Sequence, residues 1–102
     1  MKIAIIIPAR FKSSRFPGKP LAKILGVEMI IRVLKICSKA VNKKNIFVAT
    51  DNYKIRKIVE RNNFKSIMTS KACKTGTDRV AEASKKIKSK IYINVQGDEP
   101  LI

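Results

Sequence analysis

Segments of strand type and segments of helix type alternate along this chain, and this alternation constrains the fold more than any other feature. Four short apolar runs, mostly rich in β-branched residues, lie at residues 3–7, 46–49, 66–68 and 91–95. Between them are longer stretches in which apolar residues recur every three or four positions, as in amphipathic helices. Units of this kind connect parallel strands, so the sequence predicts a mostly parallel sheet with helices on its faces.

The predicted elements carry local signals at their ends. Pro8 ends the first strand because it has no amide proton for a ladder hydrogen bond. Asp51 is placed to cap the second helix, and Thr75 with Asp78 has capping-box spacing at the start of the third. The predicted apolar faces of the three helices comprise Met29, Ile30, Val33, Leu34, Cys37 and Val41; Ile55, Ile58 and Val59; and Val80, Ala83 and Ile87.

The length limits the domain organisation. With 102 residues, of which 45% are hydrophobic, the chain suffices for one domain over residues 1–102 and is too short for two. The expected class is α/β, a Rossmann-like βαβ sandwich. Sheets of this class bind ligands beyond the carboxyl ends of their strands. Four segments that follow strands are therefore expected to line one site: residues 9–19, 50–51, 69–76 and 96–99.

The chain is strongly basic, with 23 Lys and Arg against 7 Asp and Glu and a formal charge of +16. Such a charge attracts polyanions, so nucleic-acid binding is one interpretation. The lysines are scattered, however, and no zinc-finger spacing or aromatic RNA-binding signature accompanies them. The charge therefore supports an anionic ligand without identifying it, and no nucleic-acid partner is expected.

The thiols and the amino-terminal run indicate the compartment. Cys37 and Cys73 are too few and too far apart for a disulfide framework, and without histidine they do not make a zinc site. Reduced thiols in the cytoplasm are the default. The apolar start is cut off at Pro8 and followed by Arg10, so neither a signal peptide nor a membrane-spanning helix is expected.

The first loop offers several cations to the predicted site. Arg10, Arg15 and Lys19 would meet the charge of a triphosphate. Ser13 adds a neutral donor, and Gly18 lets the backbone approach a ligand closely. The alternative interpretation is a solvated polar turn.

A carboxylate pair follows the last predicted strand. Asp98 and Glu99 lie in a turn that the topology sets against the basic loop, and Asp98 is well placed to hold Mg²⁺ together with phosphate oxygens. A purely structural acidic turn is the alternative, and the basic loop nearby favours the metal.

Four blocks of the sequence resemble the 3-deoxy-manno-octulosonate (Kdo) cytidylyltransferases, also called CMP-Kdo synthetases. The blocks are IPARFKSSRFPGKPL at residues 7–21, MTS at 68–70, GTDRVAE at 76–82 and NVQGDEP at 94–100. They occur in the family's order and spacing over essentially the whole chain. Sialic-acid cytidylyltransferases share the Pro-Ala-Arg opening but differ in the segment after it, here PGKPL at residues 17–21.

The resemblance implies a fold like that of the nucleotide-diphospho-sugar transferases and an activity. The enzyme would convert CTP and Kdo into CMP-Kdo and pyrophosphate with Mg²⁺, for lipopolysaccharide synthesis in the cytoplasm, as a homodimer in its full-length form. By position, the resemblance implies contacts of Arg10, Arg15 and Lys19 with the triphosphate; of Ala9, Gly76, Thr77 and Arg79 with cytosine and ribose; of Gln96 with Kdo; and of Asp98 with magnesium. Arg10, Arg15, Lys19 and Asp98 are the expected catalytic residues.

The chain departs from the family in two respects. Cys73 stands where the family usually has histidine. Family chains are also more than twice this long, so the resemblance implies an amino-terminal portion that is inactive alone. A cytidylyltransferase for amino-substituted Kdo or sialic acid, and a nucleotide-binding fragment without turnover, are the alternatives.

Overall fold

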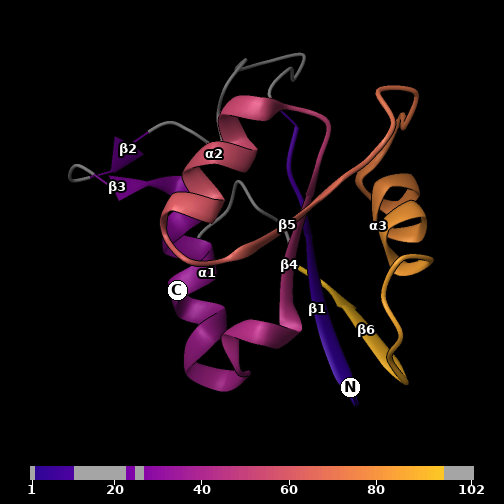
Figure 1. Ribbon diagram of the computed structural model, residues 1–102, viewed down its shortest axis with the longest axis horizontal. Helices are drawn as coiled ribbons and strands as arrows, with labels where there is room; N and C mark the ends of the chain where they lie inside the picture. The colour runs from indigo at the N-terminus through magenta and orange to yellow at the C-terminus, as the bar shows by residue number, and fades with distance from the viewer. Residues whose placement is uncertain (1, 11–22, 25–26, 96–102) are drawn as a thin grey trace.

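The computed structural model describes residues 2–10, 23–24 and 27–95. These residues contain a sheet of four strands in the order β5-β4-β1-β6 (Figure 1). The strands are β1 (Ile3–Pro8), β4 (Ile46–Thr50), β5 (Lys65–Met68) and β6 (Ile91–Asn94). All their pairings are parallel, which confirms the predicted α/β class.

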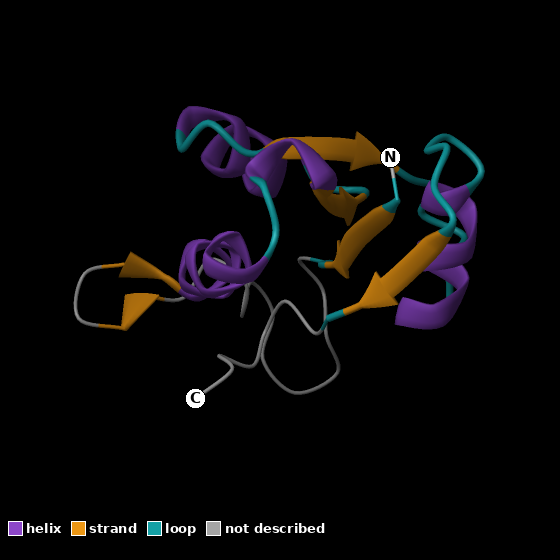
Figure 2. Cartoon of the chain, turned by 90° about the horizontal axis from the view of Figure 1, so that it is seen from below, coloured by secondary structure: helices purple, strands orange, loops and turns teal. Residues whose placement is uncertain are grey.

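Helices cover both faces of this sheet, as Figure 2 shows. α1 (Met29–Ala40) and α2 (Tyr53–Arg61) lie on one face, and α3 (Gly76–Ser84) lies on the other. A short 3₁₀ turn, η2 (Lys43–Asn45), precedes β4. No helix in the described part of the chain has the length and apolar character needed to cross a bilayer.

A small hairpin lies between β1 and α1 and was not predicted. Its antiparallel strands are β2 (Lys23–Ile24) and β3 (Val27–Glu28). Two residues per strand are too few to produce a recognisable period-2 pattern, so the sequence gives no signal for it.

The core has two layers, divided by the sheet. In β1 and just after it, Ile5, Ile7 and Ala9 pack toward α1 and α2, whereas Ala4 and Ile6 pack toward α3. Each of these side chains is at most 5% exposed. A strand buried on both faces requires a continuous apolar run, which explains why β1 shows no alternation of polar and apolar residues.

The cap of α2 corrects a prediction. Asn52, not Asp51, is the N-cap, and its Oδ1 accepts hydrogen bonds from the amides of Lys54 at 2.8 Å and Ile55 at 3.2 Å. Both candidate residues can cap a helix, and the backbone direction after β4 decides between them. Asp51 is thereby left for another role.

The start of α3 agrees with prediction, and its end does not. Thr75 caps the helix by accepting a hydrogen bond from the Asp78 amide at 3.0 Å. The helix stops at Ser84, so Ile87 lies beyond it, although its side chain is buried in the predicted core layer.

Candidate functional site

The strand order locates the place where a ligand can bind. From β1 the chain moves to β4 and then β5 on one side, and it returns to the other side of β1 to form β6. Such a reversal opens a crevice beyond the carboxyl ends of the strands. The amino terminus is at the lower end of β1 in Figure 1, so these carboxyl ends lie at the upper end of the sheet.

A cleft of about 760 Å³ lies at this end of the sheet. It is lined by Arg10, Asp51, Asn52, Tyr53, Lys54, Met68, Thr69, Lys71, Cys73 and Arg79. These residues come from the segments that follow β1, β4 and β5, together with the first turns of α2 and α3. Three of the four segments predicted to share a site therefore do so, and the fourth, residues 96–99, lies outside the described residues.

Arg79 joins two walls of the cleft. Its guanidinium donates hydrogen bonds through Nη1 to the Thr69 hydroxyl and, at 3.3 Å, to the Ser70 carbonyl. Nη2 lies 3.7 Å from Oδ2 of Asp51, and the Arg79 side chain is only 3% exposed. A buried charge needs such partners, because an uncompensated one would be strongly destabilising.

A second side chain of α3 holds the same loop, residues 69–75. Oε2 of Glu82 accepts a hydrogen bond from the Ser70 amide at 2.8 Å. Oε1 accepts one from the Cys73 thiol, with Sγ and Oε1 3.6 Å apart. The loop that forms one wall of the cleft is therefore bonded to α3 through both a cation and an anion.

The two thiols have raised pKa values for related reasons. Burial raises the pKa of the Cys37 thiol, which lies in the core as predicted. The pKa of the half-buried Cys73 thiol is raised first by desolvation and then by its hydrogen bond to Glu82 and by the Glu82 charge. Neither environment is the electropositive, exposed one that activates a cysteine as a nucleophile.

The predicted residues directly after β1 face different ways. Arg10 is exposed and lines the cleft, and its contact with an anion stays a prediction. Ala9 is 3% exposed, and its side chain packs in the core layer under α1 and α2. Its amide donates to the Ala49 carbonyl at 2.9 Å, so a ligand contact of Ala9 would have to use its carbonyl.

Gly76 and Thr77 form the first turn of α3. A Cβ added to Gly76 would lie 3.3 Å from Cγ of Pro8, so glycine permits a close approach of this helix to the end of β1. Thr77 is exposed and is not among the described residues that line the cleft.

The remaining predicted site residues, namely Ser13, Arg15, Lys19, Gln96 and Asp98, lie outside the described residues. The described part of the chain contains no group of three or more His, Cys, Asp or Glu that could hold a metal ion. Asp51, the carboxylate that lines the cleft, faces Arg79 instead. A magnesium site at Asp98 therefore stays a prediction.

The sequence predicts no role in the site for Glu82. Asp51 is predicted both in a segment that lines the site, which is confirmed, and as the cap of α2, which is wrong. The available signal for Glu82 is its spacing of three from Arg79, which places both side chains on one face of α3. No local signal identifies Asp51 as the partner of Arg79, because the two residues meet only through the sheet.

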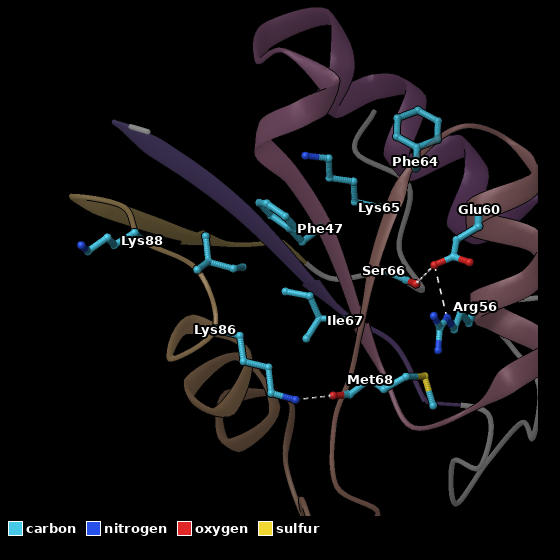
Figure 3. A pocket seen from close by; sticks show the side chains of 11 residues that line it. Phe47, Arg56, Glu60, Phe64, Lys65, Ser66, Ile67, Met68, Lys86 and Lys88 are labelled. Carbon is cyan, nitrogen blue, oxygen red and sulfur yellow. Dashed lines mark hydrogen bonds and ion pairs between the residues drawn. The ribbon is translucent and has the colours of Figure 1, made fainter.

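A larger groove, of about 940 Å³, runs along the edge of β5 that has no partner strand among the described residues (Figure 3). Three of its charged side chains are hydrogen-bonded there: Glu60 accepts hydrogen bonds from Ser66 and Arg56, and Lys86 donates one to the Met68 carbonyl at 2.9 Å. A lysine bonded to an edge carbonyl protects the strand from further pairing. The groove lies along the side of the sheet, so we place the candidate site in the smaller cleft.

Comparisons with known proteins identify the family of this chain. A profile of the family described as cytidylyltransferase matches residues 4–102. The Kdo cytidylyltransferase of Desulfosudis oleivorans is 50% identical over 105 residues, covering 100% of this chain and 42% of its own. That of Myxococcus xanthus is 53% identical over 98 residues, covering 95% and 40%. This chain thus spans about two fifths of the length of these relatives.

Two further matches concern the sugar and the nucleotide. An 8-amino-3,8-dideoxy-manno-octulosonate cytidylyltransferase of a Shewanella species is 50% identical over 105 residues, covering 100% of this chain and 43% of its own. The solved structure of a CMP:2-keto-3-deoxy-manno-octonic acid synthetase complexed with CTP superposes with a TM-score of 0.88 at 43% identity. That match covers 100% of this chain and 42% of the other.

Proposed function

This chain belongs to the cytidylyltransferase family, and from that premise we propose that it forms the CTP-binding part of an enzyme that activates Kdo as CMP-Kdo. The observation that carries the proposal is the cleft lined by Arg10, Thr69 and Arg79 at the carboxyl ends of the strands. It lies in a fold that superposes closely on a synthetase complexed with CTP.

The proposed reaction transfers a nucleotidyl group. The anomeric hydroxyl of Kdo attacks the α-phosphorus of CTP and loses its proton to solvent. The bond from that phosphorus to the bridging oxygen breaks, and pyrophosphate leaves. Positioning and neutralisation of charge catalyse such a transfer, and no protein nucleophile is needed. Arg10 on the rim of the cleft, with Arg15 and Lys19 by the resemblance, would bind the triphosphate.

The nucleotide end of the cleft would be shaped by the loop before α3. We assign the cytosine and ribose to the region of Ala9, Gly76, Thr77 and Arg79. Gly76 supports this assignment by letting α3 approach Pro8, which narrows the space beside the end of β1. A space narrowed in this way would favour a pyrimidine over a purine.

Magnesium, Kdo binding and dimerisation stay proposals that rest on the resemblance. Asp98 would hold Mg²⁺ and Gln96 would contact the sugar acid. When bound, Mg²⁺ would supply charge stabilisation to the departing pyrophosphate. The free thiols Cys37 and Cys73 are compatible with action in the reducing cytoplasm.

The amino-substituted sugar is the second candidate substrate. This chain is 50% identical both to a Kdo cytidylyltransferase and to an 8-amino-3,8-dideoxy counterpart, over 105 residues in each case. The matched portion therefore favours neither sugar.

The nucleotide part of the proposal is tested by calorimetric titration of the chain with CTP, ATP and GTP at about 0.15 M salt, where exposed charges are screened beyond ~8 Å. We expect CTP to bind at least about tenfold more tightly than either purine nucleotide, which corresponds to ~1.4 kcal/mol. Equal affinities would show simple polyanion attraction instead and would refute the proposal.

The catalytic part needs the segment that the relatives have beyond the matched region. A chimera in which the chain is followed by the corresponding segment of the Myxococcus xanthus relative is assayed for pyrophosphate release from CTP and Kdo. We expect turnover, and we expect Arg10→Ala to raise the KM for CTP. A folded chimera without turnover would count against the assignment.

A further inference from the structure

In the described part of the chain, Glu82 is the carboxylate of α3 that forms hydrogen bonds with the loop wall of the cleft. It accepts the amide of Ser70, 12 residues earlier in the sequence, at 2.8 Å. Its other oxygen accepts the thiol of Cys73 at 3.6 Å. Cys73 lines the cleft, whereas Glu82 itself lies behind the loop and is half-buried.

Arg79 binds the carbonyl of Ser70, the residue whose amide is bound by Glu82. Its Nη1 donates to the Ser70 carbonyl at 3.3 Å, and the Cys73 amide donates to that carbonyl at 3.4 Å. The Ser70 hydroxyl in turn accepts the Ala72 amide at 3.0 Å. The amide, the carbonyl and the hydroxyl of Ser70 are thus all bonded, which fixes the course of the loop.

We propose that Glu82 is a positioning residue for CTP: by bonding Ser70 and Cys73 it holds residues 69–75 in the conformation that walls the nucleotide cleft. This inference rests on the proposed function. Preorganising a loop lowers the entropy lost when a ligand binds, so the contribution of Glu82 would be seen in CTP affinity although Glu82 does not touch the nucleotide.

Electrostatics makes the proposal sharply testable. A carboxylate near the cleft repels the triphosphate, so its simple removal should strengthen CTP binding. If Glu82 positions the loop, Glu82→Ala should instead weaken CTP binding, because the loop loses the hydrogen bonds from Ser70 and Cys73 to Glu82. Glu82→Gln separates the two effects, since it removes the charge but keeps an oxygen that can accept the Ser70 amide proton.

Glu60 provides a matched control. It also lies on a helix and accepts a hydrogen bond from a serine that follows that helix, Ser66, at 2.7 Å, with Arg56 as its ion-pair partner. Figure 3 shows these contacts beside the β5 edge, in the groove and not in the candidate cleft.

The experiment measures CTP affinity by calorimetry and the rate at which iodoacetamide alkylates Cys73, resolved by peptide mass spectrometry, for Glu82→Ala, Glu82→Gln and Glu60→Ala. We expect Glu82→Ala to weaken CTP binding about tenfold, as the loss of one charge-assisted hydrogen bond can. It should also speed the alkylation of Cys73 several-fold. Glu82→Gln should keep CTP affinity at or above that of the unmodified chain, and Glu60→Ala should change neither quantity.

Three outcomes would overturn the proposal: unchanged or tighter CTP binding by Glu82→Ala, an equal loss in Glu60→Ala, or a Glu82→Gln variant as weak as Glu82→Ala. If Glu82→Ala does not fold, the CTP affinity of Glu82→Gln and the alkylation rate of its Cys73 test the proposal. If the unmodified chain itself does not bind CTP, the proposed function fails. The alkylation comparison then still shows whether Glu82 holds the loop.

Discussion

Arg79 shows how much one residue contributes here to both stability and site geometry. Its side chain is 3% exposed and bonds to residues that follow two different strands, Thr69 after β5 and Asp51 after β4. A planar guanidinium can serve several acceptors at fixed angles, which an ammonium group cannot do. Arg79 therefore fixes the relative position of two walls of the cleft.

We predict that Arg79→Lys destabilises the chain by about 1–3 kcal/mol, because a lysine leaves buried acceptors unsatisfied. Urea unfolding followed by circular dichroism measures the change. Arg56→Lys is the control, since Arg56 forms an exposed ion pair with Glu60 and should change stability by less than about 0.5 kcal/mol. Equal effects of the two substitutions would contradict the role assigned to Arg79.

Cys73 gives a pH-dependent prediction. Its pKa is raised by desolvation first, then by Glu82 as hydrogen-bond acceptor and as charge; Asp78 adds to the rise and Arg79 opposes it. Only the thiolate is alkylated, so the alkylation rate of Cys73 should reach half its maximum at a higher pH than in an unfolded control peptide. Glu82→Gln removes the charge that raises this pKa, so it should move the midpoint of the Cys73 profile to lower pH.

The raised pKa of Cys73 also determines how this thiol affects the stability of the fold as the pH changes. A raised pKa in the folded state means that the contribution to stability is full below the ordinary thiol pKa and is lost as the pH rises through the raised value. Cys73→Ser assigns the signal, because Cys37 is buried and should react only on unfolding. A midpoint of Cys73 alkylation at the same pH as in the peptide, or at a lower pH, would contradict the environment described.

At the scale of elements, helix α2 is capped by Asn52, a residue that the sequence analysis did not predict as the cap. The Asn52 side chain accepts two amides of the first turn, whereas Asp51 points to Arg79. At the other end of α2, Asn63 has a φ of 64°, which lets the chain leave the helix toward β5.

We predict that Asn52→Ala lowers stability by about 1 kcal/mol, whereas Asn52→Asp is tolerated because a carboxylate also caps and suits the positive helix end. Urea midpoints of both variants measure this. Asp51→Asn keeps the helix cap and should instead weaken the contact with Arg79, which a double-mutant cycle with Arg79→Lys would reveal as coupling. Additive effects in that cycle would contradict the contact.

At the scale of the whole molecule, the described residues form the candidate site at one end of the sheet. Cations and a loop wall meet at the carboxyl ends of β1, β4 and β5, and this part of the chain contains no cluster of acidic metal ligands. The relatives in which the matched region is embedded are longer, since this chain covers 42% of the length of the Desulfosudis oleivorans protein.

We therefore predict that the 102-residue chain binds CTP but does not turn over. Nucleotidyl transfer requires both substrates to be held in line across the α-phosphorus, and one binding surface does not achieve this. A pyrophosphate-release assay with CTP, Kdo and Mg²⁺ tests the chain beside the chimera described above. Comparable rates for the two proteins would contradict the prediction.

The sequence by itself determined the alternation of strands and helices, the doubly covered β1, the cap at Thr75 and the carboxyl-end location of the cleft. These features follow from periodicity and from short-range chemistry, which neighbouring residues specify. Only the tertiary structure decided that Asn52 caps α2, that Asp51 faces Arg79, and that Glu82 holds Ser70. The last two contacts join residues that are far apart in the sequence, so they form only when parallel pairing brings the ends of β4 and β5 beside α3.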